Sequence, residues 1–213
     1  MFNLQVMDTS YEFHKAFSFS EIHRERIGQL INYLALHING LYCTRLIKLL
    51  YIIDETAVLK LGLPITWMTY YVYKMGPVPE KLWFSIKEGN KEFGEYFDVH
   101  TEVNKHNSDH EARFRISPIS KEDPTELSKN ERKIVDSVID EFGNQSVEKL
   151  IKFLHRTDSL WYQIVQRNAI DFKQSLSTTL EIDLSALIVD NENGLAIFKD
   201  TRKEIDFLES LTK

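Results

Sequence analysis

Histidines and aspartates gather in one polar stretch of the chain, where their side chains could bind a metal ion. His100, His106 and His110 lie there together with Asp98 and Asp109. Zinc is bound by converging imidazoles or thiolates, usually with one pair of ligands at close, regular spacing. The spacings here are loose, the stretch contains no cysteine, and its polar composition predicts a solvated loop. We therefore interpret these residues as exposed loop side chains and predict no metal site.

A thiol nucleophile is the second chemistry that the residue types allow. Cys43 is the single cysteine of the chain, and His37 or His155 could act as its base. Cys43 lies between two apolar stretches, however, where a cysteine usually behaves as a small buried hydrophobe. No neighbour in the sequence indicates the lowered pKa that a nucleophilic thiol needs. We therefore interpret Cys43 as a core residue.

The carboxylate pairs and the glycines give no catalytic signal. Asp54 precedes Glu55, and Asp136 and Asp140 stand four residues apart, which places the second pair on one face of a helix. Both pairs fall in predicted helices, where a solvated face explains them. No serine lies in a Gly-x-Ser-x-Gly motif, and no glycine-rich phosphate loop is present. The sequence therefore predicts a protein that is not an enzyme and needs no cofactor.

Composition restricts the class of protein further. A chain of 213 residues that is 43% hydrophobic can form one domain with a full core. It has no apolar run of about 18 residues or more, no signal-peptide pattern at its start and one cysteine, so we expect a cytoplasmic protein without a membrane segment. A net charge of −6 argues against general nucleic-acid binding, because such binding depends on Lys and Arg that neutralise phosphates.

Apolar periodicity predicts two packed helices early in the chain. Ser18 and Glu21 have the spacing of a capping box, so the first helix is expected to begin at Ser18 and to end near Gly40. The second is expected to run from about Thr44 to Gly62. Each helix has an apolar face that it cannot bury alone, and the connection between them is short. The two helices should therefore pack against each other.

A strand, a turn and a third helix are predicted next. Thr, Trp, Tyr and Val dominate residues 65–73, a composition that favours a strand. Gly76-Pro77-Val78-Pro79 cannot continue this strand, because a proline has no amide hydrogen to donate, and is predicted to form a rigid turn. Glu80 after Pro79 is typical of the first turn of a helix.

The rest of the chain predicts a hairpin followed by helices. Residues 96–103 and 112–119 alternate between apolar and polar positions, which indicates an antiparallel hairpin with a long loop. Together these elements predict an α+β, mainly helical fold, with a compact helical domain and a small antiparallel sheet or hairpin. The remaining signals are a capping box at Ser128 and Glu131, a helix cap at Ser146, a short helix with Trp161 and Val165, a turn at Asn193-Gly194, and a closing helix over 204–211.

The first two helices also allow a helix-turn-helix interpretation. The second helix begins with Thr44 and Arg45 and carries Lys48 one turn further on. A recognition helix needs an outer face that is free and basic. This helix also carries Tyr51 and Ile52, so it is apolar nearly all round and belongs in a core. A DNA-binding transcriptional regulator remains the alternative function.

Short motifs follow one another in a fixed order along the chain. They are Lys48-Leu49-Leu50-Tyr51-Ile52 with Asp54, Pro64-Ile65-Thr66, Thr69-Tyr70, Gly76-Pro77-Val78-Pro79, Leu127-Ser128, Gly143 before Ser146, and His155 before Trp161. This ordered set resembles the SocA-like antitoxin family, which carries the Panacea domain. The resemblance covers roughly residues 20–190 and divides the chain into an N-terminal arm (1–17), a Panacea-like domain (18–190) and a C-terminal extension (191–213).

The resemblance implies an antitoxin of a toxin–antitoxin pair, of the kind often carried by bacteria or their phages. Family members neutralise a cognate protein toxin by direct protein–protein contact, and one relative acts as an adaptor that delivers its toxin to a protease. The expected partners are therefore a toxin and, on the adaptor route, a protease. The family is not known for catalysis or for a cofactor.

The aromatic strand and the following turn are the candidate partner-binding surface. Tyr and Trp are enriched among interface anchors, and a rigid turn loses little freedom when it binds. A sheet that is covered on both faces is the open alternative. The candidate residues are Tyr71, Tyr73, Lys74, Gly76, Pro77 and Pro79.

Overall fold

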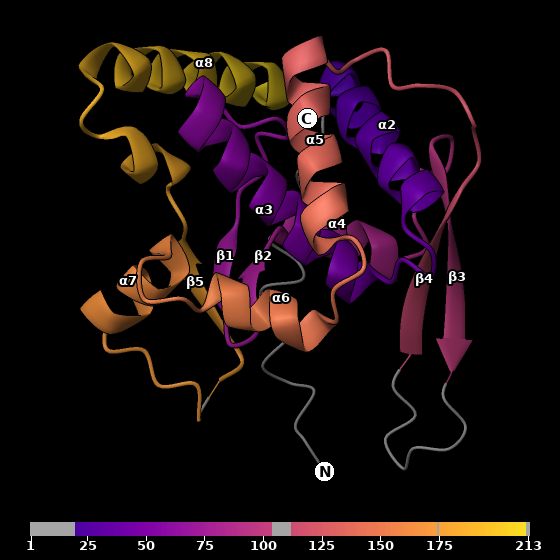
Figure 1. Cartoon of the computed structure of the whole chain (residues 1–213), viewed down its shortest axis with the longest axis horizontal. Helices are drawn as coiled ribbons and strands as arrows, with labels where there is room; N and C mark the ends of the chain where they lie inside the picture. The colour runs from indigo at the N-terminus through magenta and orange to yellow at the C-terminus, as the bar shows by residue number, and fades with distance from the viewer. Residues whose placement is uncertain (1–19, 104–111, 174, 212–213) are drawn as a thin grey trace.

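The computed structural model describes residues 20–103, 112–173 and 175–211, and their fold is α+β and mainly helical, as predicted (Figure 1). The helices are α2 (Glu21–His37), α3 (Cys43–Leu61), α4 (Glu80–Lys87), α5 (Lys129–Phe142), α6 (Val147–Leu154), α7 (Leu160–Arg167), the 3-10 helix η2 (Leu184–Ile188) and α8 (Glu192–Ser210). The strands are β1 (Tyr71–Tyr73), β2 (Gly76–Val78), β3 (Phe97–Val103), β4 (Ala112–Pro118) and β5 (Ser177–Glu181).

The strands form two small antiparallel sheets. One has the order β2-β1-β5, and the other is the predicted hairpin of β3 and β4. In Figure 1 the hairpin lies beside α2, while α8 runs across the top of the molecule. The hairpin is also attached to the segment before α3, because the Ile116 amide donates a hydrogen bond of 2.8 Å to the Leu41 carbonyl. Tyr42 and Arg115 form a single β-bridge at the same place.

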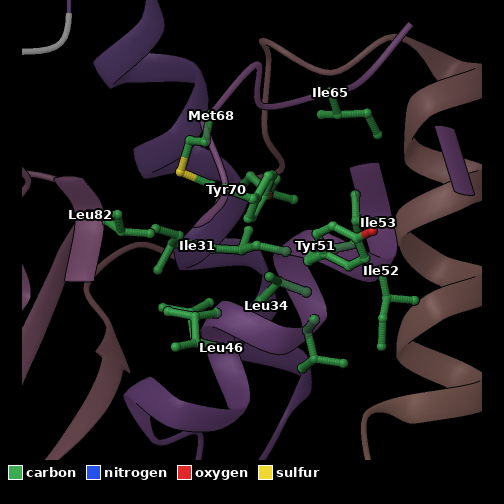
Figure 2. Packing of buried hydrophobic residues seen from close by; sticks show 14 of the residues in the cluster. Ile31, Leu34, Leu46, Tyr51, Ile52, Ile53, Ile65, Met68, Tyr70 and Leu82 are labelled. Carbon is green, nitrogen blue, oxygen red and sulfur yellow. The ribbon is translucent and has the colours of Figure 1, made fainter. Parts of the chain in front are cut away.

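Helix α3 is the central element of the core. Thirteen of its 19 residues are buried, and it packs against α4, α5, α6, β2, β4 and η2. Figure 2 shows apolar side chains of α2, α3 and the chain after α3 gathered in this core, with Ile31, Tyr51 and Tyr70 among them. The burial of its middle turns agrees with the interpretation of α3 as a core helix, while Thr44 at its start is exposed.

A buried carboxylate organises the chain after α3. Asp54 is fully buried, and it accepts hydrogen bonds of 2.8 Å from the amides of Ile65 and Thr66 and from the Tyr70 hydroxyl. The Thr66 hydroxyl donates to the same carboxylate. Burial raises the pKa of Asp54, and the hydrogen bonds from these residues oppose the rise. The amides of Ile65 and Thr66 thus donate to the Asp54 carboxylate and not to the carbonyls of a neighbouring strand.

This arrangement corrects the strand predicted over residues 65–73. Only Tyr71–Tyr73 forms a strand, and Trp67 has a positive φ of 55°. We call residues 65–70 the pinned segment, because side chains also hold its carbonyls. Arg26 donates 2.8 Å to the Ile65 carbonyl, and Arg202 donates 2.8 Å to the Trp67 carbonyl. The strand composition was overridden because side chains satisfy these backbone groups.

Two further sequence predictions are wrong in their details. The Gly76–Pro79 stretch was predicted as a turn, but Gly76–Val78 forms β2, which pairs with β1. Pro77 is tolerated there because β2 is the edge strand of its sheet, where a missing amide costs no ladder bond. Asn193-Gly194 was predicted as a turn but lies in the first turn of α8, where Asn191 caps the helix by accepting from the Gly194 amide at 2.9 Å.

The helix starts are mostly as predicted. Ser128 and Glu131 form the capping box of α5, and Ser146 caps α6. The first helix, α2, begins later than predicted, with Ser20 as its N-cap. Ser18 and the predicted arm of residues 1–17 lie outside the described residues.

The predicted C-terminal extension corresponds to α8, which packs on the domain. Phe198 is buried, and its ring centroid lies 5.0 Å from that of Trp67 in the pinned segment. Arg202 also donates 2.8 Å to the Thr69 hydroxyl. Helix α8 therefore holds the pinned segment together with α3. None of the described helices combines the length and hydropathy that crossing a bilayer requires.

Replacing Asp54 should destabilise the protein strongly. Asp54→Ala leaves four buried donors without their acceptor, so we expect the free energy of unfolding to fall by about 3 kcal/mol or more. The stability of Asp54→Asn should lie between those of the wild type and Asp54→Ala, because the amide oxygen of Asn can still accept from the two backbone amides. Urea denaturation measures both. The exposed Asp140→Ala is the control, with an expected change within about 0.5 kcal/mol. Equal stability of Asp54→Ala and Asp140→Ala would contradict this role.

Candidate partner-binding surface

The turn between β1 and β2 carries an exposed apolar surface. Lys74 and Met75 connect the strands, and Met75 is 53% exposed. Leu176, which is 65% exposed, lies beside them because the Lys74 amide donates a hydrogen bond of 2.9 Å to its carbonyl. We call Lys74, Met75 and Leu176 the β1–β2 tip. The tip combines one cation with two apolar side chains that remain in contact with solvent.

The six candidate residues lie close together but differ in exposure. Gly76, Pro77 and Pro79 are buried, so they support the surface and are not accessible to a partner. Lys74 is exposed, whereas Tyr71 and Tyr73 are half-buried. The Tyr73 hydroxyl donates 2.7 Å to Glu80, and the Tyr71 hydroxyl donates 3.3 Å to Glu181. Of the six candidates, only Lys74 and the exposed parts of Tyr71 and Tyr73 are therefore accessible to a partner.

Sequence reasoning missed Met75 and Leu176. Met75 stands between the strand and the glycine, and an exposed apolar residue in a two-residue turn was a usable signal. Leu176 gave no such signal, because its position follows from the pairing of β5 with β1 across a separation of about a hundred residues. Only the sheet brings it to the tip.

Lys48 holds the backbone of β2, the strand that follows the tip. Its side chain is 1% exposed, and its Nζ donates a hydrogen bond of 2.8 Å to the Pro77 carbonyl. Gly76 has a φ of +95°, and a Cβ added there would lie 3.5 Å from Leu154 and 3.7 Å from Lys48 Nζ. This backbone conformation strongly favours glycine. Strand β2 is therefore held close against α3 and α6.

Trp161 of α7 provides a second contact to the same hairpin. Its Nε1 donates 2.8 Å to the Tyr73 carbonyl, and its ring stacks on His155 with centroids 3.7 Å apart and an interplanar angle of 5°. Lys48 and Trp161 thus fix the two strands through carbonyls at Pro77 and Tyr73. Both residues belong to the motifs that resemble the SocA-like family, and their role here is to position the tip.

Burial shifts the pKa values of Lys48 and of two ionisable side chains near it. Burial lowers the pKa of Lys48 to about 7 and raises the pKa of the Cys43 thiol to about 12. Burial and the charge of Lys48 also lower the pKa of His155. A nucleophilic thiol needs a lowered pKa, so the shift at Cys43 agrees with its interpretation as a core residue.

Histidines of the considered metal site are only partly described. His100 lies on β3, but His106, Asp109 and His110 lie outside the described residues. Within the described part of the chain, no three His, Cys, Asp or Glu side chains are grouped to hold a metal ion.

The buried Lys48 should make stability depend on pH in the neutral to alkaline range. Its pKa is about 7 when folded against 10.5 for a free lysine, so the unfolded state binds more protons between these values. The free energy of unfolding should therefore rise with pH relative to Lys48→Met, by up to about 1.4 kcal/mol per pH unit. Urea denaturation from about pH 7 to about pH 9 measures the difference. A difference that stays constant with pH would contradict the lowered pKa.

The family comparison covers the elements that build this surface. The family model described as "Antitoxin SocA-like, Panacea domain" matches residues 46–162, which is more than half of the chain. The match includes Lys48, Asp54, Pro77 and Trp161, while α2, β5 and α8 lie outside it. Comparisons with curated proteins and with solved structures found no match. With the matched region spanning α3 to the start of α7, the chain belongs to the SocA-like antitoxin family defined by the Panacea domain.

Proposed function

We propose that this chain is an antitoxin that neutralises a cognate protein toxin by direct, stoichiometric binding through the β1–β2 tip. The observation that carries the proposal is the family match over residues 46–162, which includes Lys74 and Met75 and the residues that fix them. The proposal places function in an exposed surface and assigns the motif residues below it to positioning.

The physical case for the tip rests on its rigidity and its exposed apolar side chains. Lys48 and Trp161 hold the carbonyls on both sides of the turn, so the backbone loses little freedom on binding. Met75 and Leu176 would bury apolar area against a partner, and the flexible thioether of methionine adapts to different surfaces. Such a surface suits protein contact.

A binding role also accounts for the unusual buried groups without catalysis. Asp54 accepts four hydrogen bonds from the pinned segment, and Lys48 donates to the Pro77 carbonyl, so both serve the fold. We therefore propose that the protein acts without turning over a substrate. Delivery of the bound toxin to a protease is a variant of the same function and would use the same contact with the toxin.

Co-expression tests the function itself. The candidate toxin is the product of the open reading frame adjacent to the gene for this chain. We expect that its expression alone arrests growth, that co-expression with this chain restores growth, and that the two proteins purify together in a fixed ratio. Growth arrest that persists beside a soluble, folded product would overturn the proposal for that pair.

Charged substitutions in the tip should weaken toxin binding. Met75→Glu and Leu176→Glu place a carboxylate where an apolar contact is expected, so we predict at least a tenfold higher Kd, which corresponds to about 1.4 kcal/mol or more. Isothermal titration calorimetry measures the Kd, and circular dichroism checks the fold. Ile197→Glu on α8 is the matched control, because Ile197 is also apolar and 57% exposed. Equal loss in all three variants would remove the tip from the interface.

A further inference from the structure

A second surface lies near the tip, at the N-terminal end of α3. A groove of about 670 Å³ opens there between α3, α4, β4 and the start of α6. Trp83 lines the groove, and its ring meets that of Tyr73, the residue before the tip, edge-on at a centroid distance of 6.0 Å. The groove is therefore placed to extend a contact that begins at the tip.

The groove collects positive charge in an acidic chain. Arg45, Lys87 and Arg113 line it, and no Asp or Glu is among its described lining residues. The whole chain carries a net charge of −6, so this local balance departs from the rest of the protein. A cationic groove complements an acidic partner, both by steering its approach and by selecting against basic surfaces.

Aromatic rings hold two of these cations in place. Lys87 Nζ lies 4.1 Å from the centroid of the Trp83 ring, and Arg113 Cζ lies 4.1 Å from that of Tyr42. Each cation occupies one face of its ring, which leaves less ring surface for a nucleotide base to stack on. The cations keep donors for hydrogen bonds to oxygen anions. This arrangement favours carboxylates over nucleotides as the bound groups.

Strand β4 forms one wall of the groove, and the chain itself already covers the edge of this strand. The Ile116 amide of β4 points away from β3 and donates to the Leu41 carbonyl, and Tyr42 forms a β-bridge with Arg115. A ligand in the groove is therefore expected to contact side chains of β4 and not to extend its sheet.

We propose that this groove binds an acidic, extended segment of the toxin, which sets its carboxylates against Lys87, Arg113 and Arg45. The proposal deepens the proposed function and rests on it for the identity of the partner. It assigns the selectivity for an acidic partner to these three cations. It also predicts that binding weakens as the salt concentration rises, because these side chains are partly exposed.

The first test uses the toxin candidate from the adjacent open reading frame. Lys87→Glu/Arg113→Glu should raise its Kd at least tenfold and flatten the dependence of Kd on salt. Lys129→Glu/Lys133→Glu, which reverses two exposed charges on α5, is the matched control and should leave both unchanged. If the wild-type chain binds and restores growth but both double variants behave alike, the groove proposal fails while the proposed function stands.

The second test does not need the toxin. A short fluorescein-labelled peptide of alternating glutamate and valine should bind the wild-type chain at low salt, shift the NMR signal of the Phe114 amide, and bind Lys87→Glu/Arg113→Glu at least tenfold more weakly. The matching peptide of glutamine and valine should bind weakly to every variant. Equal binding of the two peptides, no binding of the glutamate peptide, or saturable binding of ATP in its place would overturn the acidic-segment proposal. Failure of the toxin to bind at all would count against the proposed function alone.

Discussion

The hydrogen bonds of the buried Asp54 carboxylate are the interaction on which the rest of this structure depends. A carboxylate without partners would not remain in a core, because the loss of its hydration costs several kcal/mol. Here Ile65, Thr66 and Tyr70 supply the compensating donors, so the chain after α3 must return across the helix at this point. That return sets the start of β1, and with it the sheet to which the β1–β2 tip belongs.

Helix α3 carries two such polar anchors, one on each side of the hairpin path. Asp54 holds the pinned segment before β1, and Lys48 holds β2 after the turn. Helix α8 adds Arg202, which donates to the Trp67 carbonyl of the pinned segment. Most of the motifs that resemble the SocA-like family therefore serve to fix the fold. They position the β1–β2 tip, whose exposed residues do not belong to these motifs.

The tip and the cationic groove offer a partner different chemistry at neighbouring places. The tip presents apolar side chains on a fixed backbone, and the groove presents cations above aromatic rings beside β4. Trp83 and Tyr73 connect the two surfaces. A partner that used both would gain apolar burial at one end and charge complementarity at the other, and charge complementarity contributes more to specificity than to affinity.

The sequence by itself determined helices α2 to α7, the β3–β4 hairpin and the burial of α3, because these follow from local periodicity, capping residues and the apolar surface of one element. Ser128 with Glu131 and the alternation over 96–103 are of this kind. Tertiary structure decided the path of residues 65–70, the pairing of Pro77 in an edge strand, and the hydrogen bond between Lys74 and Leu176. Those outcomes depend on donors and acceptors far apart in the chain. Asp54 shows the reason: it accepts from a backbone amide eleven residues away. In the sequence such an aspartate cannot be distinguished from a solvated one, because only the packing of the chain brings its donors to it.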